Sequence, residues 1–376
     1  MNKTMVYGIA VAALTVTSAF AQNESEQLRS EMDALTKRLN ELEAEQPEKS
    51  KTSWTDKITI KGDLRYRFEY VGKDDSTSKN RQRIRARLGA YADVNDFTTA
   101  GIRIRTGGDA NSGNQTIGGD FNAKDIYLDL AYITLAPSEA TYGAVTLGKM
   151  KYPWKVTTDL IWDSDVNPEG AAYTYATKLD NTGLFGSAGY FKVQDTSSTH
   201  DLNLGSGQIG ASQPIGEKTK LTVGGSVFAY DNSKDFNNPG ATNNTTMIDY
   251  TIAEVFGEVG FKEVLPIPFK LYGNYVNNTK ADNDEMGYCF GIKFGDAKKG
   301  KWEAKVGYRN LDLNAAPAYY ADSDFAGGGT DIKGGRVKAK YNVGKNLQVG
   351  ATLIAGTQKS SDTDVNTLHL DLIAKF

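Results

Sequence analysis

Most of the chain after residue 56 alternates between apolar and polar residues with a period of two. Residues 57–70 show this alternation most clearly. Their apolar set is Ile58, Ile60, Leu64, Tyr66, Phe68 and Tyr70, and their polar set is Lys57, Lys61, Asp63, Arg65, Arg67 and Glu69. Alternate side chains of a β-strand lie on opposite faces, so this segment predicts a strand with one face suited to lipid and the other to water. A soluble sandwich would alternate similarly, but its inner faces would not carry long rows of charge.

Turn residues divide the rest of the chain into about sixteen segments of this kind, each near the length of a tilted membrane strand. The predicted strands are 57–70, 81–94, 98–106, 125–136, 142–150, 170–178, 184–194, 202–213, 219–231, 248–261, 267–277, 286–295, 301–311, 332–342, 346–356 and 366–376. Short connectors alternate with long ones rich in Gly, Asn and Asp, such as 107–124, 232–247 and 312–331. This pattern predicts an all-β fold, a transmembrane antiparallel β-barrel with both termini in the periplasm. The apolar face is ambiguous in 184–194 and 248–261, so the strand count is defined to about two.

The first 21 residues have the pattern of a secretory signal peptide. Lys3 supplies a positive charge, residues 5–16 are mostly apolar, and Ala19-Phe20-Ala21 is a small-x-small cleavage site. A transmembrane anchor is the alternative, but the apolar stretch is shorter than the roughly 20 residues that a spanning helix needs. The mature chain is therefore expected to begin near Gln22.

Residues 22–46 change to a period of seven. The apolar positions are spaced by four and three residues and are Leu28, Met32, Leu35, Leu39 and Leu42. This spacing predicts a short periplasmic coiled coil, which a larger assembly would have to stabilise. A single helix packed on its own barrel is the alternative. Residues 47–56, which include Pro47, are then a linker, and the barrel occupies 57–376.

Composition limits the class of protein. Gly reaches 39 residues and aromatic residues make up 10% of the chain, while no segment after the signal peptide has 18 consecutive apolar residues. These features exclude a helical membrane protein and permit a barrel. The chain contains one Cys, two His and a net charge of −3, so neither a disulfide framework nor a nucleic-acid partner is indicated, and no cofactor or metal is expected.

Arginines concentrate on the predicted water-facing side of the first three strands. With the apolar parity taken as outward, the basic wall of the lumen comprises Arg65, Arg67, Arg81, Arg83, Arg85, Arg87, Arg103 and Arg105, joined late in the chain by Arg336, Lys338 and Lys340. An arginine on the lipid face would cost about 2–4 kcal/mol near the midplane, which favours the inward assignment. Such a wall can select ions. A solvated wall with ion pairs to Asp63, Glu69 and Asp93 is the alternative.

Several stretches resemble a known family. These are RYRFEY at 65–70, RQRIRARLGAYADVND at 81–96, IYLDLAYI at 126–133, LGKM at 147–150 and LIWDSDVNPEG at 160–170. They are similar to the group of Gram-negative outer-membrane proteins named "putative porin", which have a signal peptide, a short coiled coil and one barrel. The resemblance covers nearly the whole mature chain and implies a trimeric, water-filled pore in the outer membrane, without conveying its substrate.

The connector from Lys151 to Gly170 is the third external loop and carries acidic residues. They are Asp159, Asp163, Asp165 and Glu169. By resemblance to general porins, this loop would fold into the barrel and present these carboxylates to the arginine wall, which would create a transverse field. An exposed loop, or a calcium site built from Asp163, Asp165 and Glu169, is the alternative.

The last nine residues, LHLDLIAKF, alternate and end on an aromatic residue. The apolar face includes Leu368, Leu370, Leu372 and Phe376. By resemblance, such a terminal strand is the signal that the barrel assembly machinery reads.

The sequence thus predicts a non-enzymatic porin: a passive channel for small hydrophilic solutes and ions, with some anion preference, in contact with outer-membrane lipid and assembled as a homotrimer. A structural protein that tethers the envelope through its coiled coil is the alternative. An enzyme is disfavoured because only His200, beside Asp201, could serve a catalytic set at the barrel rim.

Overall fold

The computed structural model describes residues 30–38, 54–74, 76–137, 143–195, 200–233, 248–297 and 301–376. The chain divides into two units, Met1–Lys57 and Ile58–Phe376. In the first unit, residues 30–38 are helical and exposed throughout, and Trp54–Lys57 form the 3-10 helix η1. The predicted signal peptide and the coil positions Leu28, Leu39 and Leu42 lie outside the described residues. No helix within the described ranges has the length and apolar character needed to cross a membrane.

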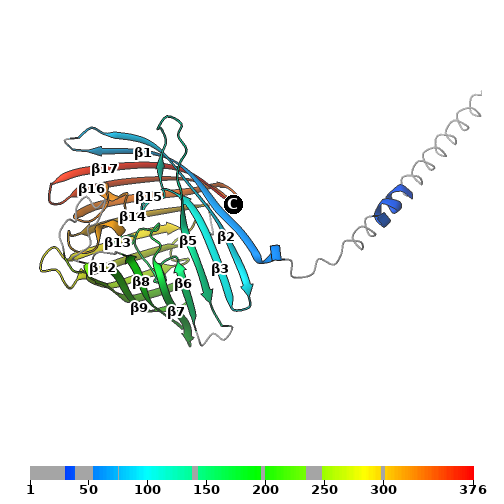
Figure 1. Ribbon diagram of the computed structural model, residues 1–376, viewed down its shortest axis with the longest axis horizontal. Coiled ribbons are helices and arrows are strands. Elements are labelled where there is room, and N and C mark those ends of the chain that lie inside the picture. Colours follow the sequence, from blue (N-terminus) through cyan, green and yellow to red (C-terminus); the bar gives the residue numbers. More distant parts are fainter. Residues whose placement is uncertain are drawn as a thin grey trace, which may run out of the picture. The chain divides into compact units, whose positions relative to one another are not determined.

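The second unit is one antiparallel sheet in which each strand pairs with its neighbours in the chain (Figure 1). Its long strands are β1 (Ile58–Lys73), β2 (Lys79–Asn95), β3 (Thr98–Thr106), β5 (Ile126–Leu135), β6 (Ala144–Lys149), β7 (Glu169–Leu179), β8 (Thr182–Gln194), β9 (Leu202–Ile215), β10 (Thr219–Asp231), β11 (Thr251–Phe261), β12 (Phe269–Asn278), β13 (Met286–Gly295), β14 (Trp302–Leu311), β15 (Ile332–Gly344), β16 (Leu347–Gln358) and β17 (Thr363–Lys375). A two-residue strand, β4 (Gln115–Thr116), pairs with β2 beside β3.

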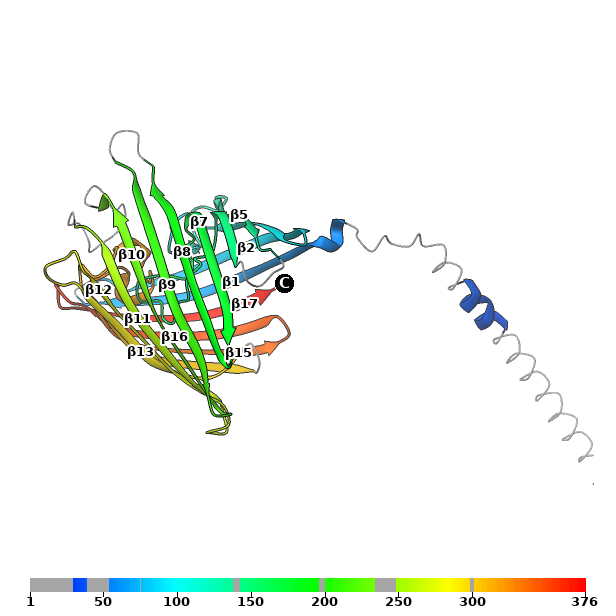
Figure 2. The ribbon, with the colours of Figure 1, turned by 90° about the horizontal axis from the view of Figure 1, so that it is seen from below.

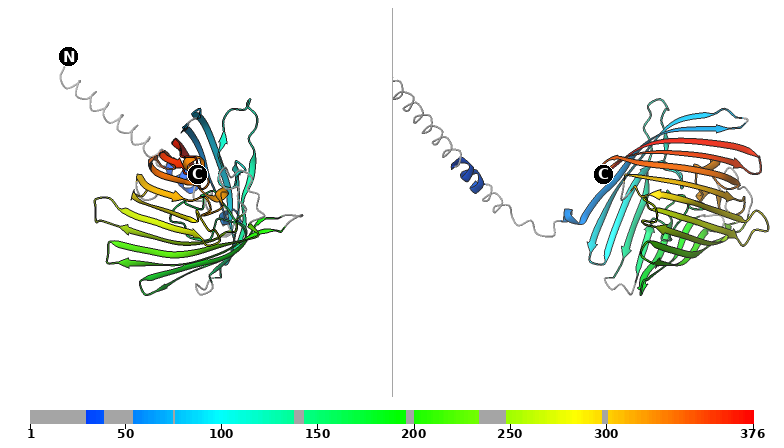
Figure 3. Two further views of the ribbon diagram at one scale, coloured as in Figure 1. Left: turned by 90° about the vertical axis from the view of Figure 1, so that its left-hand side faces the viewer. Right: turned by 180° about the vertical axis from the view of Figure 1, so that it is seen from behind.

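The last strand closes the sheet by pairing with the first. The register between β1 and β17 runs from Asp63 opposite Lys375 to Lys73 opposite Val365. Beyond it, the backbone amide of Gly62 donates to the carbonyl of Phe376 at 2.8 Å, and the Phe376 amide donates to Gly62 at 3.1 Å. The views in Figures 2 and 3 follow the strands around this closed barrel. The prediction of a barrel of about sixteen strands is therefore confirmed.

Three predicted strands were too short at the end that carries the long loops. Residues 71–73 of β1, 79–80 of β2 and 363–365 of β17 continue the ladder beyond the predicted limits. Polar residues there do not interrupt pairing, because hydrogen bonding between backbones does not depend on whether the side chains face lipid.

Side-chain exposure follows the predicted parity on the strands that close the barrel. On β1, Leu64 is 53% exposed whereas Arg67 is 3% exposed, and on β17 Leu370 is 48% exposed whereas His369 is 2% exposed. Leu370 and Leu372 of the last strand, and Phe376 after it, therefore lie on the outer surface, as lipid contact requires. Their recognition by assembly machinery stays a prediction.

The two ambiguous segments became β8 and β11, and both turn large apolar side chains inward. Phe191 on β8 is 1% exposed, and Ile252 and Phe256 on β11 are 1% and 5% exposed. Both faces of these strands are thus partly apolar, and this is why the period of two could not identify the outer face.

The contact between Gly62 and the terminal ring yields a test of barrel closure. A Cβ at Gly62 would lie 2.5 Å from Cζ of Phe376 and 2.6 Å from the Arg87 carbonyl oxygen, whereas a Cβ at Gly207 would meet nothing within 4 Å. We expect Gly62→Ala to lower the free energy of unfolding by about 1–3 kcal/mol, because the backbone of β2 must shift. Urea unfolding of the refolded protein measures this, with Gly207→Ala as the matched control. Equal stability of the two variants would refute the closure role of this contact.

Candidate functional site

The connector between β6 and β7, residues 150–168, lies inside the barrel. We call it the inner loop. Its backbone is closed at the base by a hydrogen bond from the Met150 amide to the Pro168 carbonyl at 2.9 Å. Leu160, Ile161 and Trp162 are 0%, 4% and 4% exposed, so the alternative of an exposed loop is wrong.

Aromatic side chains hold the inner loop against one side of the lumen. Trp154 lies 5.8 Å from Phe191 of β8 and 5.0 Å from Phe228 of β10, measured between ring centroids. Trp162 lies 4.8 Å from Trp154 and 5.2 Å from Phe228. Edge-to-face and tilted contacts of this kind add to the burial of apolar area. They also explain the inward apolar residues of β8, which pack on the loop rather than face water.

Toward the first strands, the inner loop contacts the arginine wall through Asp165. Its Oδ1 lies 3.4 Å from Nη1 of Arg87 and 3.7 Å from Nη1 of Arg85, both on β2. The Gly113 amide donates to its Oδ2 at 3.2 Å. The side chain is 7% exposed, so this ion pair is shielded from bulk water.

On the far side of the barrel, the inner loop contacts β12, β14 and β15. Asp159 pairs with Arg309 and with Arg336, the latter at 2.6 Å. The Thr158 hydroxyl donates to Oδ1 of Asn274 at 2.7 Å. The loop therefore crosses the lumen and is tethered by carboxylates at both walls.

A second connector, residues 312–331 between β14 and β15, also folds inward. Asp322 lies 2.7 Å from Arg336 and 3.2 Å from Arg309, and Asp324 lies 2.8 Å from Arg67. The prediction that 312–331 is a long external connector is therefore corrected, and the roles of Asp322 and Asp324 were not predicted. The signal that could have found them is the apolar run AAPAYYA at 315–321, which is unusual for a solvated loop.

The two inward loops contact each other. The Asp163 amide donates to the Tyr320 carbonyl at 2.8 Å, and the Ser323 amide donates to Oδ2 of Asp163 at 3.3 Å. The ring of Trp162 stacks on that of Tyr320 at 5.8 Å. We call this contact the loop junction.

Most of the predicted basic wall is neutralised by carboxylates. Arg81 and Arg83 pair with Glu69, Arg85 and Arg87 with Asp63, Arg103 and Arg105 with Asp129, and Arg67 with Asp371. Arg65 donates instead to the Asn114 side chain. The ion pairs to Asp63 and Glu69 are those of the alternative reading, whereas Asp93 makes none within the described part of the chain. The wall is thus a network of paired charges.

The four predicted loop acids have different surroundings. Asp159 and Asp165 meet arginines, and Asp163 belongs to the loop junction. Glu169 is the first residue of β7, where its side chain is 61% exposed and pairs with Lys149 at 2.5 Å. Glu169 therefore does not join the other three, and these carboxylates do not converge on a calcium site among the described residues.

The pKa values of Asp159 and Asp163 are shifted in opposite directions. Burial acts to raise the pKa of both groups, but Arg336 and Arg309 hold the pKa of Asp159 well below its usual value. Asp163 has no cation at ion-pairing distance within the described residues. Burial together with the neighbouring carboxylates of Asp322 and Asp165 raises its pKa well above the usual value.

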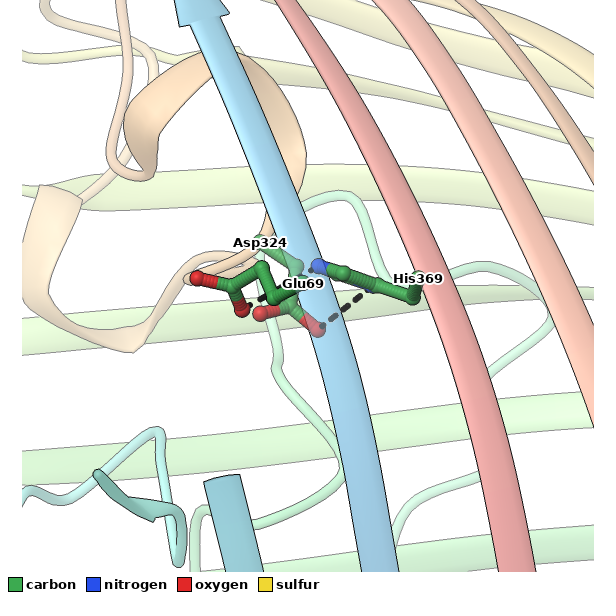
Figure 4. Close-up of side chains that lie close together, drawn as sticks. All are labelled: Glu69, Asp324 and His369. Atoms are coloured by element: carbon green, nitrogen blue, oxygen red, sulfur yellow. Dashed lines mark ion pairs between the residues drawn. The ribbon is translucent and has the colours of Figure 1, made fainter. Parts of the chain in front are cut away.

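Glu69, Asp324 and His369 lie close together at the inner wall, as Figure 4 shows. Their ligand atoms lie within 4.8 Å of one another, and His369 Nε2 is 3.3 Å from Glu69. Such a set can hold a divalent cation. However, both carboxylates already pair with arginines, so a metal ion would have to displace Arg81 and Arg83 from Glu69 and Arg67 from Asp324.

Two cavities lie at the ends of the barrel. One of about 770 Å³ is lined near the long loops by Lys73, Lys79, Asp324 and His369, among others. The other, about 1160 Å³, is lined near the short turns by Lys155, Glu258, Lys270 and Lys293, among others. Charged side chains therefore line both ends of the lumen.

Comparison with known proteins agrees with this architecture. A family model described as "Putative porin" matches residues 70–260 and 247–376. The high-pH structure of Pseudomonas putida OprB is similar with a TM-score of 0.57 at 11% identity, covering 87% of this chain and 96% of that one. No curated protein shows significant sequence similarity.

Two further structures match with lower scores. A triple mutant of the Rhodopseudomonas blastica porin has a TM-score of 0.47 at 12% identity, covering 85% of this chain and 100% of that one. Vibrio cholerae OmpT lacking loop L8 has a TM-score of 0.49 at 15% identity, with the same coverages of 85% and 100%. At its low identity, the OprB match indicates a shared barrel fold.

Removal of the Asp159 carboxylate tests the tether at the far wall. We expect Asp159→Asn to lower stability by about 3–5 kcal/mol, because among the described residues Asp322 is then the one carboxylate left to pair with Arg309 and Arg336. Glu169→Gln is the control, since its exposed ion pair contributes roughly 0–1 kcal/mol. Urea unfolding followed by tryptophan fluorescence compares them. A loss for Asp159→Asn no larger than that for Glu169→Gln would exclude the tether.

The raised pKa of Asp163 predicts a pH effect at the loop junction. A carboxyl whose pKa is raised on folding binds its proton more tightly in the folded state, so folding is favoured as the pH falls through that raised pKa. Asp159, with its lowered pKa, keeps its ion pairs until more acidic pH. We expect acidification from pH 7 to about 5 to raise the Tm of the wild type relative to that of Asp163→Asn. A difference in Tm that does not change with pH would contradict this assignment.

Proposed function

This chain belongs to the "Putative porin" family, and from that membership we propose that it is a passive diffusion channel for small hydrophilic solutes and ions, with a preference for anions, in the Gram-negative outer membrane. The observation that carries the proposal is a closed barrel with charged cavities at both ends and a tethered loop across its lumen. Such an arrangement can select solutes by width and by electric field.

The tethers of the inner loop support a fixed constriction rather than a mobile lid. Asp165 at one wall and Asp159 at the other each meet two arginines. Paired buried charges resist displacement, because removal of one partner leaves the other uncompensated in a poorly solvated site. A constriction of constant width suits passive sieving, in which no chemical step occurs.

Anion preference is supported by the balance of charge along the walls. The arginine wall carries the eight arginines of β1, β2 and β3 named above, which meet six carboxylates, namely Asp63, Glu69, Asp129, Asp165, Asp324 and Asp371. Two positive charges therefore remain, since eight minus six is two. An excess of this sign raises the local concentration of anions.

Assembly as a homotrimer is a further part of the proposal. Met32 and Leu35 form an apolar stripe on the helical residues 30–38, where they are 67% and 65% exposed. Helices of other copies would bury this stripe as a coiled coil. Recognition of the last strand by the barrel assembly machinery belongs to the same proposal.

Neutralising the arginine wall tests the anion preference. We expect Arg83→Gln, Arg85→Gln and Arg87→Gln together to lower anion permeability relative to cation permeability several-fold, because Asp63 and Asp165 lose their partners. The reversal potential of the refolded protein in a planar bilayer, measured across a KCl gradient, reports this ratio.

A triple variant of exposed lysines, Lys178→Gln, Lys280→Gln and Lys345→Gln, controls for the change in net charge. An unchanged reversal potential in the arginine variant would reject its role in selectivity. A folded wild-type protein that carries no current would reject the channel and favour a structural protein that tethers the envelope.

A further inference from the structure

Four lysines lie opposite one another on four neighbouring strands. In the register of β12 to β15, Lys270 is opposite Lys293, Lys293 is opposite Lys305, and Lys305 is opposite Lys338. We call these residues the lysine row. Directly opposed side chains have Cβ atoms about 4.5–5.5 Å apart, and like charges in such positions destabilise a sheet. A row of this kind is unfavourable unless something compensates it.

Two members of the lysine row are compensated by carboxylates. Lys270 lies 3.0 Å from Glu258, which also pairs with Lys155 of the inner loop at 3.2 Å. Lys293 lies 2.9 Å from Glu303, whose other oxygen is 3.8 Å from Lys340. Each glutamate therefore already serves two lysines.

The other two members, Lys305 and Lys338, have no carboxylate within 4.0 Å among the described residues. Both are half-buried on the inner wall. Nζ of Lys305 lies 4.9 Å from the centroid of the Tyr272 ring. Asp159 lies on the same side of the lumen but is engaged by Arg309 and Arg336. The two ammonium groups thus form an uncompensated pair.

The local sum of charges differs from that of the arginine wall. Six lysines gather here, namely Lys155, Lys270, Lys293, Lys305, Lys338 and Lys340, and they meet two glutamates. Four positive charges therefore remain, since six minus two is four. The excess on this wall is twice that on the arginine wall, and Lys305 and Lys338 stand at adjacent positions within it.

We propose that Lys305 and Lys338 form a binding subsite for a dianionic phosphoryl group. A compact dianion between two opposed ammonium groups would relieve their repulsion and accept a charge-assisted hydrogen bond from each. Half-burial strengthens this attraction relative to that of exposed lysines. The group can come from free phosphate or from a phosphomonoester. This inference rests on the proposed channel function and names a class of solute for it.

The test is the block of KCl current by phosphate through the full-length refolded protein in a planar bilayer at about pH 7.5, where phosphate is mostly dianionic. We expect inorganic phosphate to reduce the current saturably, whereas acetate, a monovalent carboxylate, does not. Lys305→Gln with Lys338→Gln should weaken the apparent affinity of phosphate about tenfold or more. Lys305→Arg with Lys338→Arg should retain the block.

Lys178→Gln with Lys345→Gln is the matched control, because it removes two positive charges from exposed side chains of the same barrel that line neither of the two cavities described above. We expect its block to stay within about twofold of the wild type. The same measurement with glycerol phosphate distinguishes free phosphate from a phosphomonoester as the ligand. Block by both compounds shows that the subsite binds the phosphoryl group of either one, whereas block by inorganic phosphate alone shows that it binds only the free ion.

The subsite would be overturned if phosphate block were unchanged in the glutamine variant of Lys305 and Lys338, or if it were weakened equally in that variant and in the control. The proposed channel function would still stand in either case. Absence of current in folded wild-type protein would instead overturn the channel. Heat-modifiable migration on SDS gels shows that each variant is folded, and the double glutamine variant should fold because it removes a like-charge contact.

Discussion

Backbone hydrogen bonding between β1 and β17 is the constraint on which the rest of the structure depends. Lipid offers no partners for the amides and carbonyls of a strand edge, so a spanning sheet must close on itself. Closure is made by the register from Asp63 to Lys73 and by the reciprocal hydrogen bonds between Gly62 and Phe376. Once the sheet is closed, every strand has a lipid-facing side and a lumen-facing side, and charged side chains at membrane depth must face the lumen.

The crowding of charge in the lumen then determines what the loops do. Arginines at the inner wall need carboxylates, and the strands supply some of them as Asp63, Glu69 and Asp129. The two inward loops supply others, of which Asp165 and Asp324 serve the arginine wall. Closure of the barrel places arginines in the lumen, and their ion pairs with carboxylates of the inner loop hold this loop in place. Its aromatic residue Trp154 packs on Phe191 of β8 and Phe228 of β10.

Pairing also changes which residues can act on a solute. Arginines that are fully engaged by carboxylates contribute little net field, whereas lysines without a carboxylate partner contribute more. The sequence pointed to the arginine wall because its arginines recur at alternate positions along the strands. Lys305 and Lys338 lie on different strands, and only the register between β14 and β15 places them opposite each other.

Strand positions, the barrel class and the inward direction of the arginines could be read from the sequence, because the period of two is a local property and lipid enforces it strictly. The parity of β8 and β11 could not be read, since Phe191 and Ile252 face inward and both faces of these strands therefore carry apolar residues. The inward fold of residues 312–331 and the partners of Asp159 were likewise decided by tertiary structure. Ion pairs join residues such as Asp159 and Arg336 that are far apart in the chain. Local sequence specifies that a charge needs a partner, and only the closed fold specifies which one it meets.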